Sequence, residues 1–285
     1  MKALVLGARG QLGAELVRVL GERGHLVTGL GRHELDITRA EAVEQAFRQH
    51  RPDWVLNAAA YNQVDVAESE PLAAMQVNGV AVRHMAVCCR ETGALLLHYS
   101  TDHVFSGRKS APYIEDDAPA PVSAYGVSKL AGELYAQVYV EKLYVVRTAG
   151  VFGPAGRTTN RGNFVELMLR LAGEGRTIRV VEDFLASPTY APALAERSVD
   201  LIERGVPYGV YHIAGGSGIS WYGYARKIFA QTEIQADVRP TNEKEYPTPA
   251  RRPKYSVLSN AKMEAAGLAL MPPLEDALVE YFSRR

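Results

Sequence analysis

The chain has 285 residues, a length that favours one large domain or one domain with a smaller lobe. Its 32 basic and 32 acidic residues give a formal net charge of zero, which argues against binding of nucleic acid or of a membrane surface. The first apolar run is too short for a signal peptide, and no stretch has the ~18 apolar residues that span a bilayer. We therefore expect a cytoplasmic protein.

Strands and helices alternate along the first 150 residues. Short apolar runs predict strands, and helical spacing of apolar residues predicts the helices between them. The expected strands are 3–6, 26–30, 54–57, 94–99 and 144–147. The expected helices are 11–20, 40–50, 75–92 and 125–139. Apolar strands without polar alternation indicate a parallel sheet covered on both faces, so the expected class is α/β, a Rossmann-type doubly wound sheet.

The regular alternation stops after residue 150. We expect a loop over 153–162, helices over 163–172 and within 188–204, and strands over 178–181 and 209–213. Residues 240–253 contain four prolines and show no period, which predicts a wrapping loop without regular secondary structure. The predicted domains are a dinucleotide-binding domain over 1–150, to which residues at about 176–215 could add, and mainly a substrate-binding lobe over 151–285.

The first strand ends in a glycine-rich loop that leads directly into a helix. Glycine permits positive φ and a close approach of the backbone to a pyrophosphate, and the helix N-terminus offers free N–H groups. The order of strand, loop and helix at the chain start predicts a nicotinamide dinucleotide site. The residues expected to contact the dinucleotide here are Gly7, Arg9, Gly10, Gln11, Leu12 and Gly13.

The end of the second strand favours NADP over NAD. No carboxylate follows this strand before Glu34, whereas Arg32 stands close to its end. An arginine there can pair with the 2′-phosphate of NADP, and Arg9 could join it. The alternatives are NAD as cofactor and Arg32 as a solvated loop charge. After the third strand, the small side chains of Ala58, Ala59 and Ala60 would let the backbone lie against the ribose.

Tyr125 and Lys129 form a candidate catalytic pair. They stand at positions i and i+4, which share one face of a helix. A nearby lysine charge favours the ionised phenol and would make Tyr125 a usable general acid and base. Thr101 follows the fourth strand, at the edge where open α/β sheets bind ligands, and can hydrogen-bond a substrate oxygen. This constellation predicts reduction of a ketone, with Tyr125 as the proton donor.

Several segments resemble the dTDP-4-dehydrorhamnose reductase family of the extended short-chain dehydrogenase/reductase superfamily. The similar segments are 7–13 with Glu15, 57–61, 64–71, 98–102 with 104–105, 125–133, 162–164, 187–190, and 247–253 with Ser256 and Leu258. The resemblance implies NAD(P)H-dependent reduction of the 4-keto group of dTDP-4-dehydro-L-rhamnose. It also implies that Asp36 and Ile37 contact the adenine and that Lys129 contacts the nicotinamide ribose.

The expected partner is a nucleotide sugar, bound by a monomer or a homodimer. The candidate substrate contacts are Val64, Asp102, His103, Arg251 and Arg252. The two arginines could bind the diphosphate or simply face solvent. Some family members bind magnesium at a dimer contact through the glutamate that matches Glu15. Because no set of partner ligands is apparent, we predict no metal site and a surface charge at Glu15.

Two positions depart from the family pattern. His103 replaces a frequent tyrosine, and Gly150 stands where the family often has a tryptophan that stacks on the sugar. A reductase or epimerase of another nucleotide sugar is therefore one alternative. A second is a non-catalytic NADP-binding regulatory subunit, like the β subunit of methionine adenosyltransferase. A dehydratase is disfavoured, because it would be expected to carry glutamate at position 103.

Overall fold

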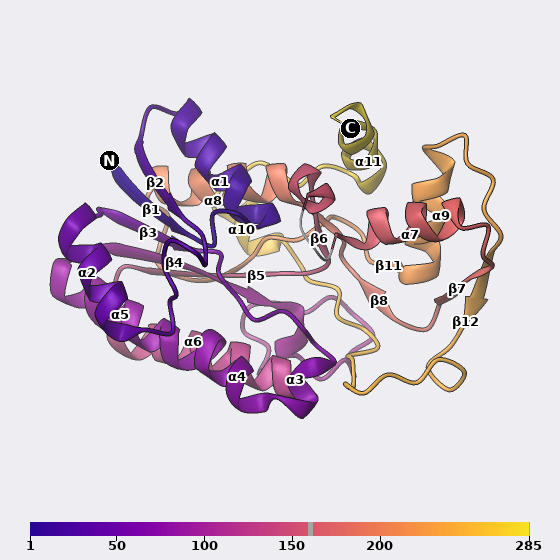
Figure 1. The fold of residues 1–285 in the computed structure, drawn as a ribbon, viewed down its shortest axis with the longest axis horizontal. Helices are drawn as coiled ribbons and strands as arrows, with labels where there is room; N and C mark the ends of the chain where they lie inside the picture. The colour runs from indigo at the N-terminus through magenta and orange to yellow at the C-terminus, as the bar shows by residue number, and fades with distance from the viewer. Residues whose placement is uncertain (159–161, 285) are drawn as a thin grey trace.

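The computed structural model describes residues 1–158 and 162–284, and its core is a six-stranded sheet. All neighbouring strands of this sheet run parallel (Figure 1). In spatial order they are β2 (Leu26–Leu30), β1 (Lys2–Leu6), β3 (Trp54–Asn57), β4 (Leu95–Thr101), β5 (Leu143–Thr148) and β10 (Gly209–His212). The strand order switches direction at β1, which lies between β2 and β3. The predicted fold class is confirmed.

Helices cover both faces of this sheet. One face carries α1 (Gln11–Glu22) and α8 (Ala191–Glu203), and the other carries α2 (Ala40–His50), α5 (Ala81–Thr92) and α6 (Ala124–Tyr139) (Figure 1). Neighbouring residues of a strand enter opposite cores: Val5 packs under α1, and Leu4 packs on the α2 side. Burial on both faces explains the continuous apolar runs in the sequence. Within the described residues, no helix is long and apolar enough to cross a membrane.

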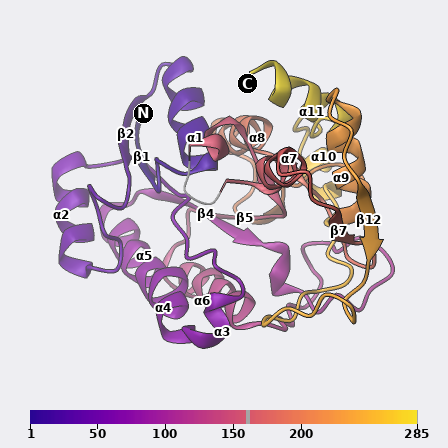
Figure 2. The ribbon, with the colours of Figure 1, turned by 45° about the vertical axis from the view of Figure 1, so that its right-hand side comes forward.

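The elements after residue 150 form a smaller lobe beside the C-terminal ends of β4 and β5 (Figures 1 and 2). Its helical elements are η3 (Pro154–Arg157), α7 (Phe164–Gly173), α9 (Trp221–Ala230) and α11 (Leu274–Ser283). Its short sheets pair β6 (Val151–Phe152) with β9 (Thr189–Tyr190), β8 (Leu185–Ala186) with β11 (Ile219–Ser220), and β7 (Ile178–Val181) with β12 (Val238–Thr241). Residues 159–161 of the predicted 153–162 loop lie outside the described residues.

Three late elements join the main body instead of this lobe: β10, α8, and α10 (Ala261–Ala265), which packs against β10. β10 pairs in parallel with β5, and α8 packs against α1. A segment after residue 150 therefore completes the six-stranded sheet, while the predicted dinucleotide-binding domain and its limits stay a prediction.

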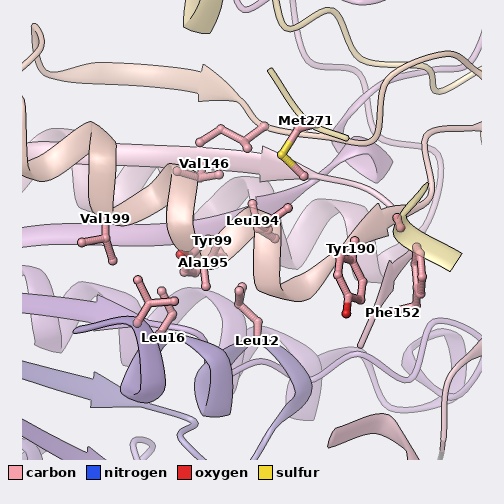
Figure 3. Packing of buried hydrophobic residues seen from close by; sticks show 14 of the residues in the cluster. Leu12, Leu16, Tyr99, Val146, Phe152, Tyr190, Leu194, Ala195, Val199 and Met271 are labelled. Carbon is pink, nitrogen blue, oxygen red and sulfur yellow. The ribbon is translucent and has the colours of Figure 1, made fainter. Parts of the chain in front are cut away.

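The helix that follows the glycine loop, α1, packs against α8 through a buried apolar core (Figure 3). Leu12 and Leu16 of α1 face Leu194 and Val199 of α8, and the last three of these side chains are fully buried. Burying one such side chain stabilises the fold by about 1.5–3 kcal/mol. Because Leu12 points into this core, any contact of residue 12 with a dinucleotide would come from its backbone.

The predicted helix over 75–92 is not one regular α-helix. It consists of α4 (Pro71–Met75), the π-helical turn η1 (Gln76–Val80) and α5. Asn78 in η1 donates from Nδ2 to Ser128 Oγ at 3.0 Å and to the Tyr61 carbonyl at 2.8 Å. This wider turn directs the Asn78 amide toward both Tyr61 and Ser128 of α6. The spacing of apolar residues along the chain does not predict such a turn. Both cysteines of α5, Cys88 and Cys89, are buried.

The predicted loop over 240–253 is also partly wrong. Its first residues belong to β12, which pairs in parallel with β7 so that Pro240 lies opposite Val180. A two-stranded sheet has only edge strands, so the missing N–H of Pro240 costs no interior ladder bond.

Candidate active site

The glycine loop closes tightly over the end of β1. Gly7 has φ +77°, and a Cβ there would lie 2.6 Å from the backbone nitrogen of Ala59. A Cβ on Gly13 would lie 2.1 Å from the Gly7 carbonyl oxygen. Gly10 precedes α1 without a side-chain cap, so the first N–H groups of the helix stay available to an anion. These features fit the pyrophosphate of a dinucleotide.

A cavity of about 750 Å³ opens beside this loop. It is lined by Gly7, Arg9, Gly10, Arg32, Asp36, Ile37, Ala58, Ala59 and Ala60, together with Gly31, Leu35, Thr38, Tyr61 and neighbouring residues. The structure therefore brings nine of the predicted dinucleotide contacts to one cavity, whereas Gln11, Leu12, Gly13, Tyr125 and Lys129 are not part of its lining. Gln11 is an exception, because its Oε1 accepts from Gly153 N at 3.1 Å and from Asn163 Nδ2 at 3.0 Å.

The two arginines near the adenosine end differ in their surroundings. Arg9 forms a salt bridge to Glu34 at 2.6 Å. Arg32 is exposed and makes no salt bridge to any described residue. Thr38 donates to Asp36 Oδ1 from both its Oγ1 and its backbone N–H, which lowers the pKa of that carboxyl. Arg32 is therefore the cation at this edge of the cavity that remains available to a phosphate.

Tyr125 and Lys129 lie on α6, next to the end of β4. Ser123 caps this helix by accepting from Gly126 N at 3.2 Å, which places Tyr125 in its first turn. Lys129 is 3% exposed and donates from Nζ to the Tyr99 carbonyl of β4 at 2.6 Å. Burial lowers the pKa of Lys129 to about 8. The Lys129 side chain is thus anchored to β4, one helical turn after Tyr125.

The expected effect of Lys129 on Tyr125 is not seen in this structure. Burial raises the pKa of Tyr125 to about 12, with Thr101 opposing the rise and the Asp102 carboxylate adding to it. The Lys129 ammonium instead donates to the Tyr99 carbonyl. At neutral pH the phenol is protonated and can donate.

Thr101, Asp102 and His103 continue from β4 into the short helix η2 (Asp102–Val104). Thr101 Oγ1 donates to Asp102 Oδ1 at 3.0 Å and accepts from His103 N at 3.2 Å. The His103 ring meets the Tyr125 ring edge-on, with 5.5 Å between centroids. Burial lowers the pKa of His103, although Asp102 opposes this. The predicted substrate contacts at Asp102 and His103 therefore border the Thr101–Tyr125 pair.

A C-terminal segment returns to this site, and we call residues 247–258 the strap. It runs from the smaller lobe toward α3 (Val66–Ser69), as both ribbon views show (Figures 1 and 2). Arg252 binds Asp65 in a bidentate pair, with nitrogen–oxygen distances of 2.9 and 2.7 Å. This pairing lowers the pKa of Asp65. Arg252 therefore fastens the strap beside the half-buried Val64, whereas Arg251 is exposed.

Two buried groups next to the site, Ser256 and Glu133, belong to segments that resemble the family but were not predicted as site residues. Ser256 of the strap donates to Asp102 Oδ2 at 2.5 Å. Glu133 of α6 binds Arg147 of β5 through both carboxylate oxygens, at 2.8–3.2 Å, and also accepts from the Ser100 hydroxyl. A signal for Ser256 was present, because it is the one polar residue between Tyr255 and Leu258. Neither partnership follows from local spacing.

Glu15 is not the surface charge that was predicted. It is 4% exposed, and its carboxylate accepts from Arg18 at 2.8 Å and from Arg284 at 3.2 Å. The residues here do not fit a divalent cation, because two guanidinium groups already occupy both oxygens. No cluster of three metal-ligating side chains occurs within 1–158 and 162–284.

Gly150 adopts φ +52°, a conformation that favours glycine. A Cβ at this position would stand 3.4 Å from the Trp221 ring. An aromatic side chain from the start of α9 therefore lies beside the position where the family often has tryptophan.

Comparison with known proteins agrees with this arrangement. The whole chain, residues 1–285, matches the family described as the RmlD substrate binding domain. A dTDP-4-dehydrorhamnose reductase of Streptomyces griseus is 43% identical, covering 98% of this chain and 92% of the relative. The chain belongs to the dTDP-4-dehydrorhamnose reductase family.

Two further relatives show the range of this family. The dTDP-4-dehydrorhamnose reductase of Bacillus anthracis, solved in complex with NADP, has a TM-score of 0.94 and 34% identity, covering 100% of this chain and 99% of that one. A probable dTDP-4,6-dihydroxy-2-methyloxan-3-one 4-ketoreductase of Streptomyces antibioticus is 38% identical over 99% of this chain and 95% of its own length. The names of both relatives describe reductases of dTDP-linked sugars.

Proposed function

We propose that this protein reduces the 4-keto group of dTDP-4-dehydro-L-rhamnose to give dTDP-L-rhamnose. The observation that carries the proposal is the contact of Thr101, at the end of β4, with Tyr125 of α6, a helix that also carries the buried Lys129, on the same sheet whose β1 leads into the glycine loop. The family relatives supply the substrate class.

The cofactor supplies the reducing electrons to the carbonyl carbon when it is bound. Tyr125 donates its phenolic proton to the carbonyl oxygen, which its raised pKa of about 12 permits at neutral pH. Thr101 orients that oxygen. Lys129, held by the Tyr99 carbonyl, adds a cation at the base of the site. Asp102 and His103 border the sugar.

NADP is the cofactor that the residues favour. Arg32 at the cavity edge would bind the 2′-phosphate, the glycine loop would hold the pyrophosphate, and Ala58, Ala59 and Ala60 would lie against the ribose. In support, the Bacillus anthracis relative was solved with NADP.

Replacing Arg32 with alanine tests this preference. We expect the dissociation constant of NADPH to rise by about tenfold or more, because a charge-assisted contact to a phosphate contributes ~1.5–3 kcal/mol. The dissociation constant of NADH should stay within about twofold. Cofactor fluorescence titration measures both, with Arg48→Ala on the exposed face of α2 as the control. Equal weakening of both cofactors would contradict a 2′-phosphate contact.

Another dTDP-4-keto sugar is the second candidate substrate. Gly150 and the 38% identical ketoreductase of Streptomyces antibioticus favour it. Parallel assays with dTDP-4-dehydro-L-rhamnose and with other dTDP-4-keto sugars decide between them by kcat/KM. An epimerase would interconvert its substrates without net loss of NADPH, and a regulatory subunit would bind NADPH without turnover.

A further inference from the structure

Ser256 connects the strap to the proposed catalytic threonine through a single carboxylate. Asp102 accepts from Ser256 at one oxygen, 2.5 Å away, and from Thr101 at the other, 3.0 Å away. Ser256 is 3% exposed, Asp102 4% and Thr101 6%. Each hydroxyl therefore has its own carboxylate oxygen in a place from which water is largely excluded.

The direction of the Thr101 hydroxyl matters for the reaction. A threonine has only one hydroxyl hydrogen, and Asp102 accepts it in this structure. The same hydroxyl acts on Tyr125, since Thr101 opposes the rise in the pKa of the phenol. Asp102 and the reacting groups therefore compete for one hydrogen. Any movement of the carboxylate changes where that hydrogen points.

The position of Asp102 depends on the two hydroxyls. Within the described residues, no salt bridge holds this carboxylate. Ser256 itself is fixed by its backbone, because its N–H donates to the Leu185 carbonyl at 2.9 Å and the Arg252–Asp65 pair fastens the strap. Without the Ser256 hydroxyl, Asp102 Oδ2 loses the only hydrogen bond that a described residue makes to it, and the carboxylate is free to rotate toward Thr101.

We propose that Ser256 is a positioning residue for ketone reduction: it holds Asp102, which sets the direction of the Thr101 hydroxyl. The strap thereby completes the site from a segment more than 150 positions away from Asp102 in the sequence. This inference rests on the proposed reductase function.

The test compares Ser256→Ala and Ser256→Cys with the wild-type enzyme. Cysteine fills nearly the same space as serine but is a weak donor, so it separates the hydroxyl from packing. Steady-state kinetics with NADPH and dTDP-4-dehydro-L-rhamnose gives kcat and KM, and fluorescence titration gives NADPH affinity. Ser259→Ala is the matched control, because Ser259 lies just past the strap and its Oγ accepts from Ala261 N.

We expect both Ser256 variants to lose about tenfold in kcat, which is ~1.4 kcal/mol. NADPH affinity should stay unchanged in both, and Ser259→Ala should keep wild-type kcat. If kcat of Ser256→Ala stays within about twofold of wild type, or if cysteine restores it, the inference is overturned. A wild-type enzyme that binds NADPH but reduces no 4-keto sugar would overturn the proposed function as well.

Discussion

Replacing Tyr125 with phenylalanine should lower kcat by about 10²–10⁴-fold, the usual contribution of a positioned general acid. The phenol next to Thr101 is the proton donor of the proposed reaction, and its pKa of about 12 keeps it protonated at neutral pH. Steady-state kinetics would show the loss in kcat. Phenylalanine keeps the ring contact with His103, so the thermal midpoint should change little.

A matched variant separates the chemistry from the packing. Tyr139→Phe removes a hydroxyl at the far end of the same helix, where the phenol accepts from Arg83 Nε at 3.3 Å. Its kcat should equal that of the wild type. A Tyr125→Phe enzyme that retains most of its turnover would show that another group donates the proton.

Replacing Glu133 with glutamine should destabilise the fold by about 3–5 kcal/mol, because it leaves a buried guanidinium without its counter-charge. The side chains of Arg147 and Glu133 are 4% and 1% exposed, and Glu133 accepts three hydrogen bonds from Arg147. Urea unfolding followed by circular dichroism measures the change in the free energy of unfolding.

The exposed Glu44–Arg48 pair of α2 provides the control. Glu44→Gln should change the free energy of unfolding by less than about 1 kcal/mol, as surface pairs do. In the double variant Glu133→Leu with Arg147→Met, most of the loss should be recovered, because no unpaired charge remains buried. Equal effects of Glu133→Gln and Glu44→Gln would mean that the buried pair does not support the fold.

Local patterns were sufficient for the scaffold and for part of the site. The glycine loop needs only neighbouring residues to form: Gly7 takes positive φ, and Gly13 lets α1 approach the strand. Tyr125 and Lys129 share a helix face at i and i+4, so their spacing in the sequence is enough to predict that they lie close together. Apolar runs predicted the parallel sheet because both of its faces are buried.

Long-range polar partners could not be predicted in the same way. Ser256 and Asp102 are 154 positions apart, Arg252 and Asp65 are 187 apart, and Arg284 and Glu15 are 269 apart. The local sequence does not specify which distant polar side chain a residue of the strap or of the C-terminus will bind. Glu15 was interpreted as a surface charge because no set of partner metal ligands was apparent, and its contact with the distant Arg284 was not foreseen.

The ionisation of the site shows the same limit. The sequence places a lysine one turn from Tyr125, and this spacing suggested a lowered pKa for the phenol. The structure directs Lys129 Nζ to the Tyr99 carbonyl and buries the phenol, so the pKa of Tyr125 rises instead. Burial and hydrogen-bond direction are tertiary properties that helical spacing alone does not determine.

The most direct test of the central claim is the consumption of NADPH by the purified protein with dTDP-4-dehydro-L-rhamnose, together with identification of the product. We expect one NADPH to be oxidised for each dTDP-L-rhamnose formed, and no oxidation when the sugar nucleotide is omitted. Intact NADPH binding without oxidation of the cofactor would contradict the proposed reduction and would favour another keto sugar or a purely regulatory role.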